Sequence, residues 1–400
     1  MPTEAFITGD LLRWARERAD VSPDALAKSL HVSTDEIAEW ENGESRPSFR
    51  KAQDAAHRLK IPFGYLFLSK RPADRLELPD LRAPTNGELA SPSVDLLDVV
   101  EETIRKQAWL RDYLLEQGSE PLAFVGRFGL DAAAVDVATD IRNELGMTRE
   151  FRREASSWEN FLTRLVRRIE DTGIVVFRSG IVGGNTHRPL DPEEFKGFVI
   201  SDRVAPAIFV NTKDWKASQI FTLGHELAHI WLGASGVSDP DITRPAHDYE
   251  SSVERLCDQV AAEVLVPAED FTRDWGSSTR LAANIEALAT SYRVSQIVVL
   301  RRASELGVIS TEQFYQDYTR QLRERQSREE KITDDEDEVK KPTGNFYTSF
   351  FARNSTTFMA VLFDAVAGGL STSSEAASLA GVKRTTIEKL MARGPEARSG

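Results

Sequence analysis

The sequence predicts a mostly helical α+β protein in which one small sheet interrupts a long succession of helices. Apolar residues recur at helical spacing through the first seventy residues, from about 94 to 168, and again after 254. Between 174 and 210, three short runs of β-branched and aromatic residues are separated by glycine, proline and polar residues, which is typical of strands. At 400 residues the chain is longer than one core usually supports, so we expect several domains.

Composition excludes several classes of protein. With 41% hydrophobic and 28% charged residues the chain is globular. It has no run of about 18 apolar residues and no signal-peptide pattern at the N-terminus, so we expect a cytoplasmic protein without a membrane span. The single cysteine, Cys257, cannot form an internal disulfide or supply a cysteine-rich metal site. The net charge of −13 argues against a protein that coats nucleic acid, but it leaves room for a small DNA-reading module.

Shifts in composition predict the domain boundaries. Prolines and glycine mark a linker near the N-terminus, and an acidic run at 334–338 marks another near the C-terminus. We see no internal repeat. The predicted order is a helical module (1–70), a linker (71–93), a helical connecting region (94–160), a domain containing the sheet (161–310), a charged helix with an acidic linker (311–341), and a C-terminal helical region (342–400).

The strongest chemical signal is the run His225-Glu226-Leu227-Ala228-His229. Two imidazoles at positions i and i+4 lie on one face of a helix, so both can reach one zinc ion at about 2.0–2.1 Å. Glu226 projects to the side, near a metal-bound water, where a general base must lie. The alternative is that the two histidines lie on one helix by chance and bind no metal. The apolar neighbours predict a buried helix, however, and burying three such polar side chains is costly unless a metal pairs them.

A catalytic zinc ion usually takes three protein ligands and a water, so a third ligand is required. Glu254 and Asp258 are one helical turn apart on a later helix. We predict that Glu254 binds the metal and that Asp258 accepts a hydrogen bond from a ligand imidazole, which would fix its tautomer. Cys257 and His247 are rival ligands, although Cys257 is more typical of a small buried residue.

The segments 221–231, 208–211 and 254–267 resemble the ImmA/IrrE family of bacterial zinc metallopeptidases, and the resemblance extends over about 161 to 306. It implies a gluzincin-like fold, with a small sheet packed on the helix that bears the two histidines. Asparagine is common in this family where the chain has Asp258. The implied mechanism uses Glu226 to take a proton from water and return it to the leaving amine. Tyr249, His247 and Tyr292 are candidate oxyanion donors by chemical type alone.

Residues 10–67 resemble the XRE family of helix-turn-helix domains. The third helix would enter a major groove, and basic residues would flank it. Five acidic residues and no basic one lie between 33 and 44, which opposes approach to phosphates, so a module that docks a protein partner is the alternative. The predicted base-edge residues are Thr34, Asp35, Ala38 and Glu39, and the predicted flanking residues are Arg46, Arg50 and Lys51.

The C-terminal tail contains another helix, glycine turn and helix, over about 374–387, with the basic residues Lys383, Arg384 and Lys389. A second nucleic-acid contact is one interpretation of this pattern. Short patterns of this kind are common in plain helical hairpins, and we favour the hairpin.

Two functions are consistent with these features. The first is a cytoplasmic zinc endopeptidase fused to a helix-turn-helix, which by family resemblance would cleave a repressor or antitoxin in a stress, phage or mobile-element response. The second is a DNA-binding regulator or antitoxin-like protein whose metal domain senses or stabilises. An intact Glu226 favours the enzyme, because a purely structural site needs no base. The predicted partners are a protein substrate, DNA and, in a homodimer, a second copy of the chain.

Overall fold

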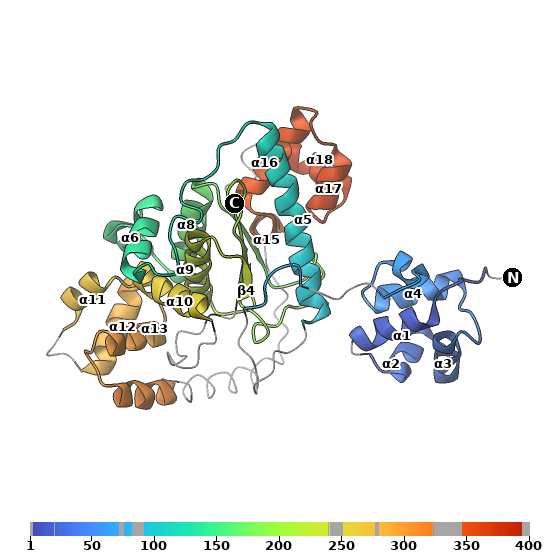
Figure 1. Cartoon of the computed structure of the whole chain (residues 1–400), viewed down its shortest axis with the longest axis horizontal. Coiled ribbons are helices and arrows are strands. Elements are labelled where there is room, and N and C mark those ends of the chain that lie inside the picture. The colour runs from blue at the N-terminus through green and yellow to red at the C-terminus, as the bar shows by residue number, and fades with distance from the viewer. Residues whose placement is uncertain are drawn as a thin grey trace. The chain divides into compact units, whose positions relative to one another are not determined.

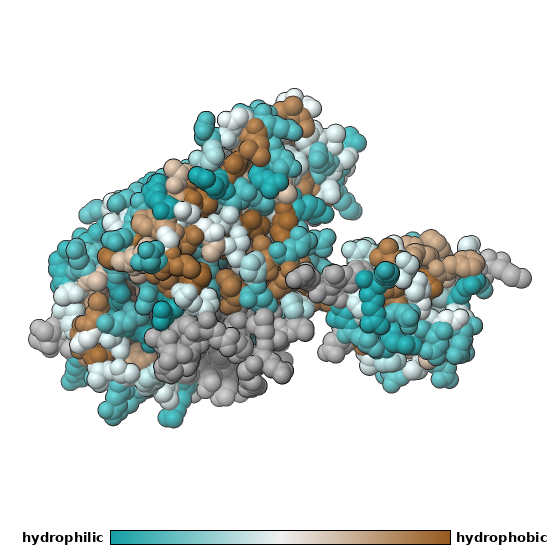
Figure 2. All heavy atoms as spheres, in the orientation of Figure 1, coloured by the Kyte–Doolittle hydropathy of each residue, from teal (hydrophilic) through white to brown (hydrophobic). Residues whose placement is uncertain are grey.

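The computed structural model describes residues 3–19, 21–71, 76–81, 92–238, 240, 251–276, 280–321, 323 and 346–393. These residues form two compact units, whose elements are labelled in Figure 1. Unit 1 comprises 1–77 with 90–100, and unit 2 comprises 78–89 with 101–400. The predicted acidic linker lies outside the described residues. Hydrophilic residues are spread over both units in Figure 2, and none of the described helices is both long and apolar enough to cross a bilayer.

Unit 1 is a small helical bundle in which serine side chains cap the starts of the second, third and fourth helices. The Ser22 and Ser33 side chains accept hydrogen bonds from backbone N–H groups of the following turns, and Glu36 completes a capping box with Ser33. Leu12, Leu26 and other apolar side chains fill the core. The helices are α1 (Gly9–Arg18), α2 (Pro23–Leu30), α3 (Thr34–Asn42) and α4 (Phe49–Arg58), followed by the 3₁₀ helix η1 (Phe63–Phe67).

Unit 2 is built around a four-stranded mixed sheet in the order β1-β3-β2-β4. β1 (Val175–Ser179) runs parallel to β3 (Ala207–Asn211), whereas β2 (Gly197–Ile200) is antiparallel to both β3 and β4 (Gly236–Ser238). The first three strands match the three β-branched runs of the sequence. β4 was not predicted, because Gly-Val-Ser is too short to show alternation.

Part of the predicted 71–93 linker is attached to this sheet. The N–H of Leu81 donates to the Val237 carbonyl, and the N–H of Val237 donates to the Pro79 carbonyl, both at 2.9 Å. Residues 79–81 therefore extend the sheet beside β4, and the expectation of a plain linker is wrong for this stretch.

Helices cover both faces of the sheet (Figure 1). Val176, Ile208 and Val210 belong to the main core together with α9 (Lys216–Leu232) and α8 (Trp158–Asp171). On the other face the Phe177 ring contacts Phe358 of α16 (Thr356–Ala367), with 5.7 Å between ring centroids. The period-two alternation of a strand places neighbouring residues on opposite faces, so the sheet separates two layers of helices.

The remaining helices complete the layers. α10 packs on both α9 and α6, and α15 lies against β1, so the predicted C-terminal region packs on the sheet domain. The bounds are α5 (Val94–Glu116), α6 (Ala134–Glu144), α7 (Arg149–Arg153), α10 (Ser252–Leu265), α11 (Ala268–Asp274), α12 (Leu281–Tyr292), α13 (Gln296–Glu305), an unlabelled helix over 311–321, α15 (Phe346–Asn354), α17 (Ser373–Leu379) and α18 (Arg384–Ala392).

Candidate metal centre

The candidate site lies where α9 packs against α10. Every residue of α9 from 219 to 231 is buried, as the apolar sequence around the histidines predicts. His225 and His229 are fully buried one helical turn apart, and Glu254 enters from the first turn of α10. Ser251 caps that turn by accepting a hydrogen bond from the N–H of Glu254. Two packed helices thus fix all three side chains.

The three side chains converge on one point. The Nε2 atoms of His225 and His229 are 3.0 Å apart. Glu254 Oε1 is 2.9 Å from Nε2 of His229, and Oε2 is 3.3 Å from Nε2 of His225. Ligand atoms around a tetrahedral zinc ion, with bonds of about 2.1 Å, would be about 3.4 Å apart. Glu254 Oε1 makes no hydrogen bond within the described residues despite its short contact, so the arrangement fits a metal better than a hydrogen-bonded cluster.

Asp258 lies behind His225, on the side away from the other two groups. Its Oδ1 is 2.7 Å from Nδ1 of His225. If Nδ1 carries the proton and donates it to this carboxylate, the lone pair of Nε2 is directed toward Glu254 and His229. The Nδ1 of His229 has no such partner in the part of the chain that the structure describes. Asp258 therefore lies where a residue that orients one ligand is needed.

Cys257 belongs to the same cluster. Its thiol and a ring nitrogen from each of His225 and His229 all lie within 4.8 Å of one another. Burial raises the pKa of the Cys257 thiol well above its usual value, which disfavours the thiolate that binds metals. Glu254 makes the shorter contacts and is the stronger candidate ligand, while His247 lies outside the described residues.

Charge is unevenly distributed within this buried group. Burial lowers the pKa of His225, but the carboxylates of Glu254 and Asp258 outweigh burial and raise it well above its usual value. Burial lowers the pKa of His229. For Glu254, burial raises the pKa, yet the two imidazoles outweigh burial and bring it down to about 2. In the metal-free protein the protonated His225 imidazole is therefore the positive partner of the Glu254 carboxylate, and a divalent cation would take over that role when it displaces the proton.

Glu226 is fully buried beside the cluster, and neither of its carboxylate oxygens makes a hydrogen bond within the described residues. Burial raises its pKa to about 8, although His225 and the nearby Ser238 hydroxyl oppose this shift. A buried carboxylate without a partner is costly, and proteins retain such groups mainly where they have a chemical role.

Gly197 on β2 creates the space that Glu226 occupies. A Cβ atom at this position would lie 2.6 Å from Cγ2 of Thr222 and 2.9 Å from Oε1 of Glu226. Only glycine therefore fits without a shift of the neighbouring groups. Sequence reasoning missed both Gly197 and Ser238, although a glycine inside a strand often marks a close approach.

The family comparison agrees with this geometry. Residues 169–304 match the model of the IrrE N-terminal-like domain, Peptidase M78. This segment is therefore similar to an M78 peptidase domain. Residues 12–66 match a helix-turn-helix model, and no curated protein matches the chain. Both family resemblances seen in the sequence are confirmed, and the chain joins a metallopeptidase-type domain to a helix-turn-helix.

The helix-turn-helix presents the predicted recognition residues to solvent. All four of the predicted base-edge residues on α3 are exposed. Two of the five acidic residues that oppose DNA have roles in the fold: Glu36 completes the Ser33 cap, and Glu41 is buried against Arg16 at 2.6 Å. Glu36 stays exposed, so the acidic charge that faces solvent is smaller than the sequence suggests by Glu41 alone.

The three basic residues that are predicted to flank the major groove differ in their contacts. Arg50 is exposed in the first turn of α4. The Arg46 guanidinium lies over the Phe6 ring, 3.9 Å from its centroid. The Lys51 ammonium donates to the Leu30 carbonyl at the C-terminal end of α2, so it holds two helices together. Arg50 is consequently the best placed of the three to reach a phosphate.

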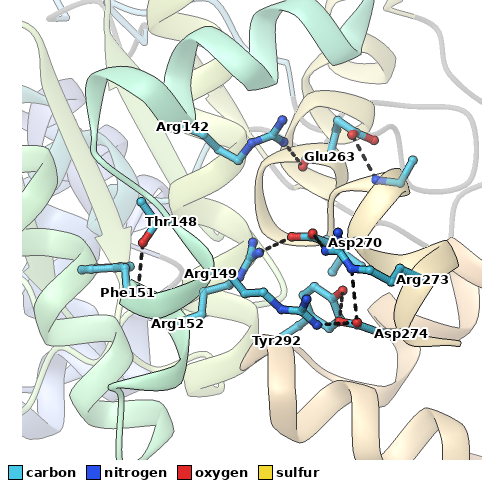
Figure 3. Close-up of polar contacts among 12 residues, drawn as sticks. Arg142, Thr148, Arg149, Phe151, Arg152, Glu263, Asp270, Arg273, Asp274 and Tyr292 are labelled. Carbon is cyan, nitrogen blue, oxygen red and sulfur yellow. Dashed lines mark hydrogen bonds and ion pairs between the residues drawn. The ribbon is translucent and has the colours of Figure 1, made fainter.

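The Tyr292 side chain contacts residues outside the metal cluster. Its hydroxyl donates to Oδ2 of Asp274 at 3.0 Å, and the Arg152 guanidinium lies over its ring. Figure 3 shows this polar network, in which Arg149 and Arg152 of α7 contact acidic residues of α11. The network links α7 to α11 and α12 and gives no support to Tyr292 as an oxyanion donor. The other two candidates, His247 and Tyr249, lie outside the described residues.

Proposed function

We propose that this chain is a zinc-dependent endopeptidase in which His225, His229 and Glu254 hold the ion. The observation that supports this most strongly is the convergence of three buried side chains beside Glu226, whose carboxylate makes no hydrogen bond with the residues that the structure describes. When bound, zinc would polarise the scissile carbonyl and lower the pKa of water at the site. Asp258 would keep the His225 ring oriented through its contact at Nδ1.

Glu226 would act as the general base. Its carboxylate would take the proton of the attacking water and return it to the nitrogen of the leaving amine, so that the residue ends each cycle unchanged. The packed surroundings of α9 and β2 exclude bulk water from Glu226, which strengthens its electrostatic interactions with the reacting groups.

The proposed substrate is a regulatory protein of the repressor or antitoxin type, cleaved in the cytoplasm during a stress, phage or mobile-element response. The support is the fusion itself, since one chain carries both a peptidase domain and a helix-turn-helix. A comparison of new protein N-termini in cells that express the parent or the Glu226→Gln variant would identify substrates. If no new N-terminus appears in cells with the parent and not in cells with the variant, a DNA-binding regulator whose metal domain senses or stabilises is favoured.

The formation of a homodimer stays a prediction.

Metal content tests the ligand set. Purified protein should hold about one zinc ion per chain, and Glu254→Ala should lose it because a three-ligand site becomes a two-ligand site. Cys257 lies three residues after Glu254 in the same buried cluster, and Cys257→Ala should keep its zinc. Metal analysis after dialysis decides between the two residues. Full occupancy in Glu254→Ala together with loss in Cys257→Ala would make the thiol the third ligand.

DNA binding by the N-terminal domain is tested at Arg50. Arg50→Gln should weaken binding of the full chain to all DNA sequences alike and reduce the slope of log affinity against log salt by about one, because one phosphate contact is lost. Arg58→Gln, at the exposed opposite end of α4, is the matched control and should change neither quantity. If Arg50→Gln is also without effect, a protein-docking role for this domain gains support.

A further inference from the structure

The C-terminal helices α17 and α18 reproduce the helix-turn-helix of unit 1, with residue numbers that differ by 350 throughout. The turn is the clearest point of agreement. His31 and Gly381 both adopt the left-handed conformation, with φ of 52° and 63°. The following N–H of Val32 donates to the Ala27 carbonyl at 3.1 Å, and that of Val382 donates to the Ala377 carbonyl at 3.0 Å.

The caps and the buried positions agree as well. Ser22 and Thr372 each accept a hydrogen bond from the N–H three residues later at the start of the first helix. A plain hairpin needs only two facing apolar stripes, whereas here each position that is buried in the N-terminal motif is also buried in the C-terminal one, which in addition buries Leu379 where Ser29 is exposed. The buried residues of the N-terminal motif are Leu26, Ala27, Leu30, Ile37 and Trp40, and their counterparts are Ala376, Ala377, Ala380, Ile387 and Leu390.

The two motifs differ in charge. The segment 33–43 contains four acidic residues and no basic one, whereas 383–393 contains four basic residues and one acidic residue. Lys383, Arg384 and Lys389 are exposed. Lys383 and Lys389 form no ion pair within the described residues, while Arg384 pairs with Glu388 at 2.7 Å. The C-terminal motif therefore has the positive charge that binding to a polyanion requires.

We propose that α17 and α18 form a second DNA-binding helix-turn-helix, in which α18 enters the major groove of duplex DNA. The first turns of a recognition helix contact base edges, and at those positions α18 carries Arg384 and Thr385, which correspond to Thr34 and Asp35. Arginine is the residue that most often reads guanine in the major groove. Duplex DNA is favoured over double-stranded RNA, whose major groove is too narrow for a helix.

The test measures binding of the full chain to a fluorescent duplex of about 30 base pairs of mixed sequence, roughly three helical turns. Lys383→Gln/Lys389→Gln should lower affinity on the order of tenfold or more and reduce the salt slope, since two positive charges on the proposed DNA-binding face are lost. The control Arg153→Gln/Arg167→Gln removes the same charge from exposed positions on α7 and α8. It should leave both quantities unchanged.

Equal effects of the two double variants would show that only net charge matters and would overturn the proposal. So would an unchanged salt slope in Lys383→Gln/Lys389→Gln, or no DNA binding by the parent at low salt. The melting temperature checks the fold, and both lysines are exposed, so it should not change. Combining the variant with Arg50→Gln tests whether the two motifs act independently, because independent contacts lose affinity additively. The proposal requires no proteolytic activity and holds whether or not zinc is bound.

Discussion

Glu226→Gln should reduce proteolysis by several orders of magnitude while the protein keeps its zinc and its fold. General-base help alone typically contributes 10²–10⁴-fold, and Glu226 would also deliver the proton to the leaving amine. Glutamine has nearly the same volume as glutamate, so the packing beside Gly197 is preserved. The measurement is the cleavage rate of a substrate found from the new N-termini, made alongside metal analysis.

Stability provides the control for Glu226→Gln. Burial raises the pKa of this carboxyl from 4.5 to about 8 in the metal-free protein. The folded state then binds the proton more tightly than the unfolded state, so Glu226 makes the free energy of unfolding fall as pH rises from about 4.5 to about 8. Metal-free Glu226→Gln should therefore be at least as stable as the parent at neutral pH. If the variant keeps both zinc and biological effect, the enzyme proposal is wrong and the domain is a sensor or scaffold.

Local chemistry made much of the site predictable from sequence. The spacing of His225 and His229 on an apolar helix is sufficient to place both imidazoles on one buried face. The serine caps are equally local, because Ser22 and Ser33 each bond to the turn that directly follows them. The choice of Glu254 followed from the same helical periodicity on α10. These features depend on residues within one or two turns of each other, which is the range over which a sequence pattern is informative.

Features that depend on tertiary register could not be predicted in this way. Gly197 lies opposite Glu226 only because β2 packs on α9, and nothing near either residue indicates the pairing. Residues 79–81 pair with β4 although Pro79 and the polar residues around it are typical of a linker. The sequence favours a plain hairpin for the C-terminal motif, because only Ala27, Val32 and Ile37 are identical to their counterparts among residues 21–40, while the caps, the turn and most buried positions agree through different residues.

Gly197→Ala should lower the proteolytic rate on the order of a hundredfold while zinc content stays near that of the parent. The added Cβ would lie 2.6 Å from Cγ2 of Thr222 and 2.9 Å from both Oε1 of Glu226 and the Phe209 carbonyl. The backbone of β3 cannot yield cheaply, so the Glu226 carboxylate must move, and a displacement of about 1 Å in a catalytic group can cost about 10² in rate. The proposed metal ligands on α9 and α10 are not among the three atoms that would lie nearest to the new Cβ.

Two further variants show whether the displacement of Glu226 is the cause. Gly64→Ala introduces the same methyl group where no atom lies within 4 Å, and it should leave the rate unchanged. Thr222→Ser removes the Cγ2 atom of the closest contact, so adding it to Gly197→Ala should recover part of the lost rate, and the double-mutant cycle measures that coupling. Overpacking of a core also costs about 1–3 kcal/mol of stability, which thermal unfolding would detect. A Gly197→Ala protein with the parental rate would mean that Glu226 has room to act elsewhere, and the placement of the base against β2 would have to be abandoned.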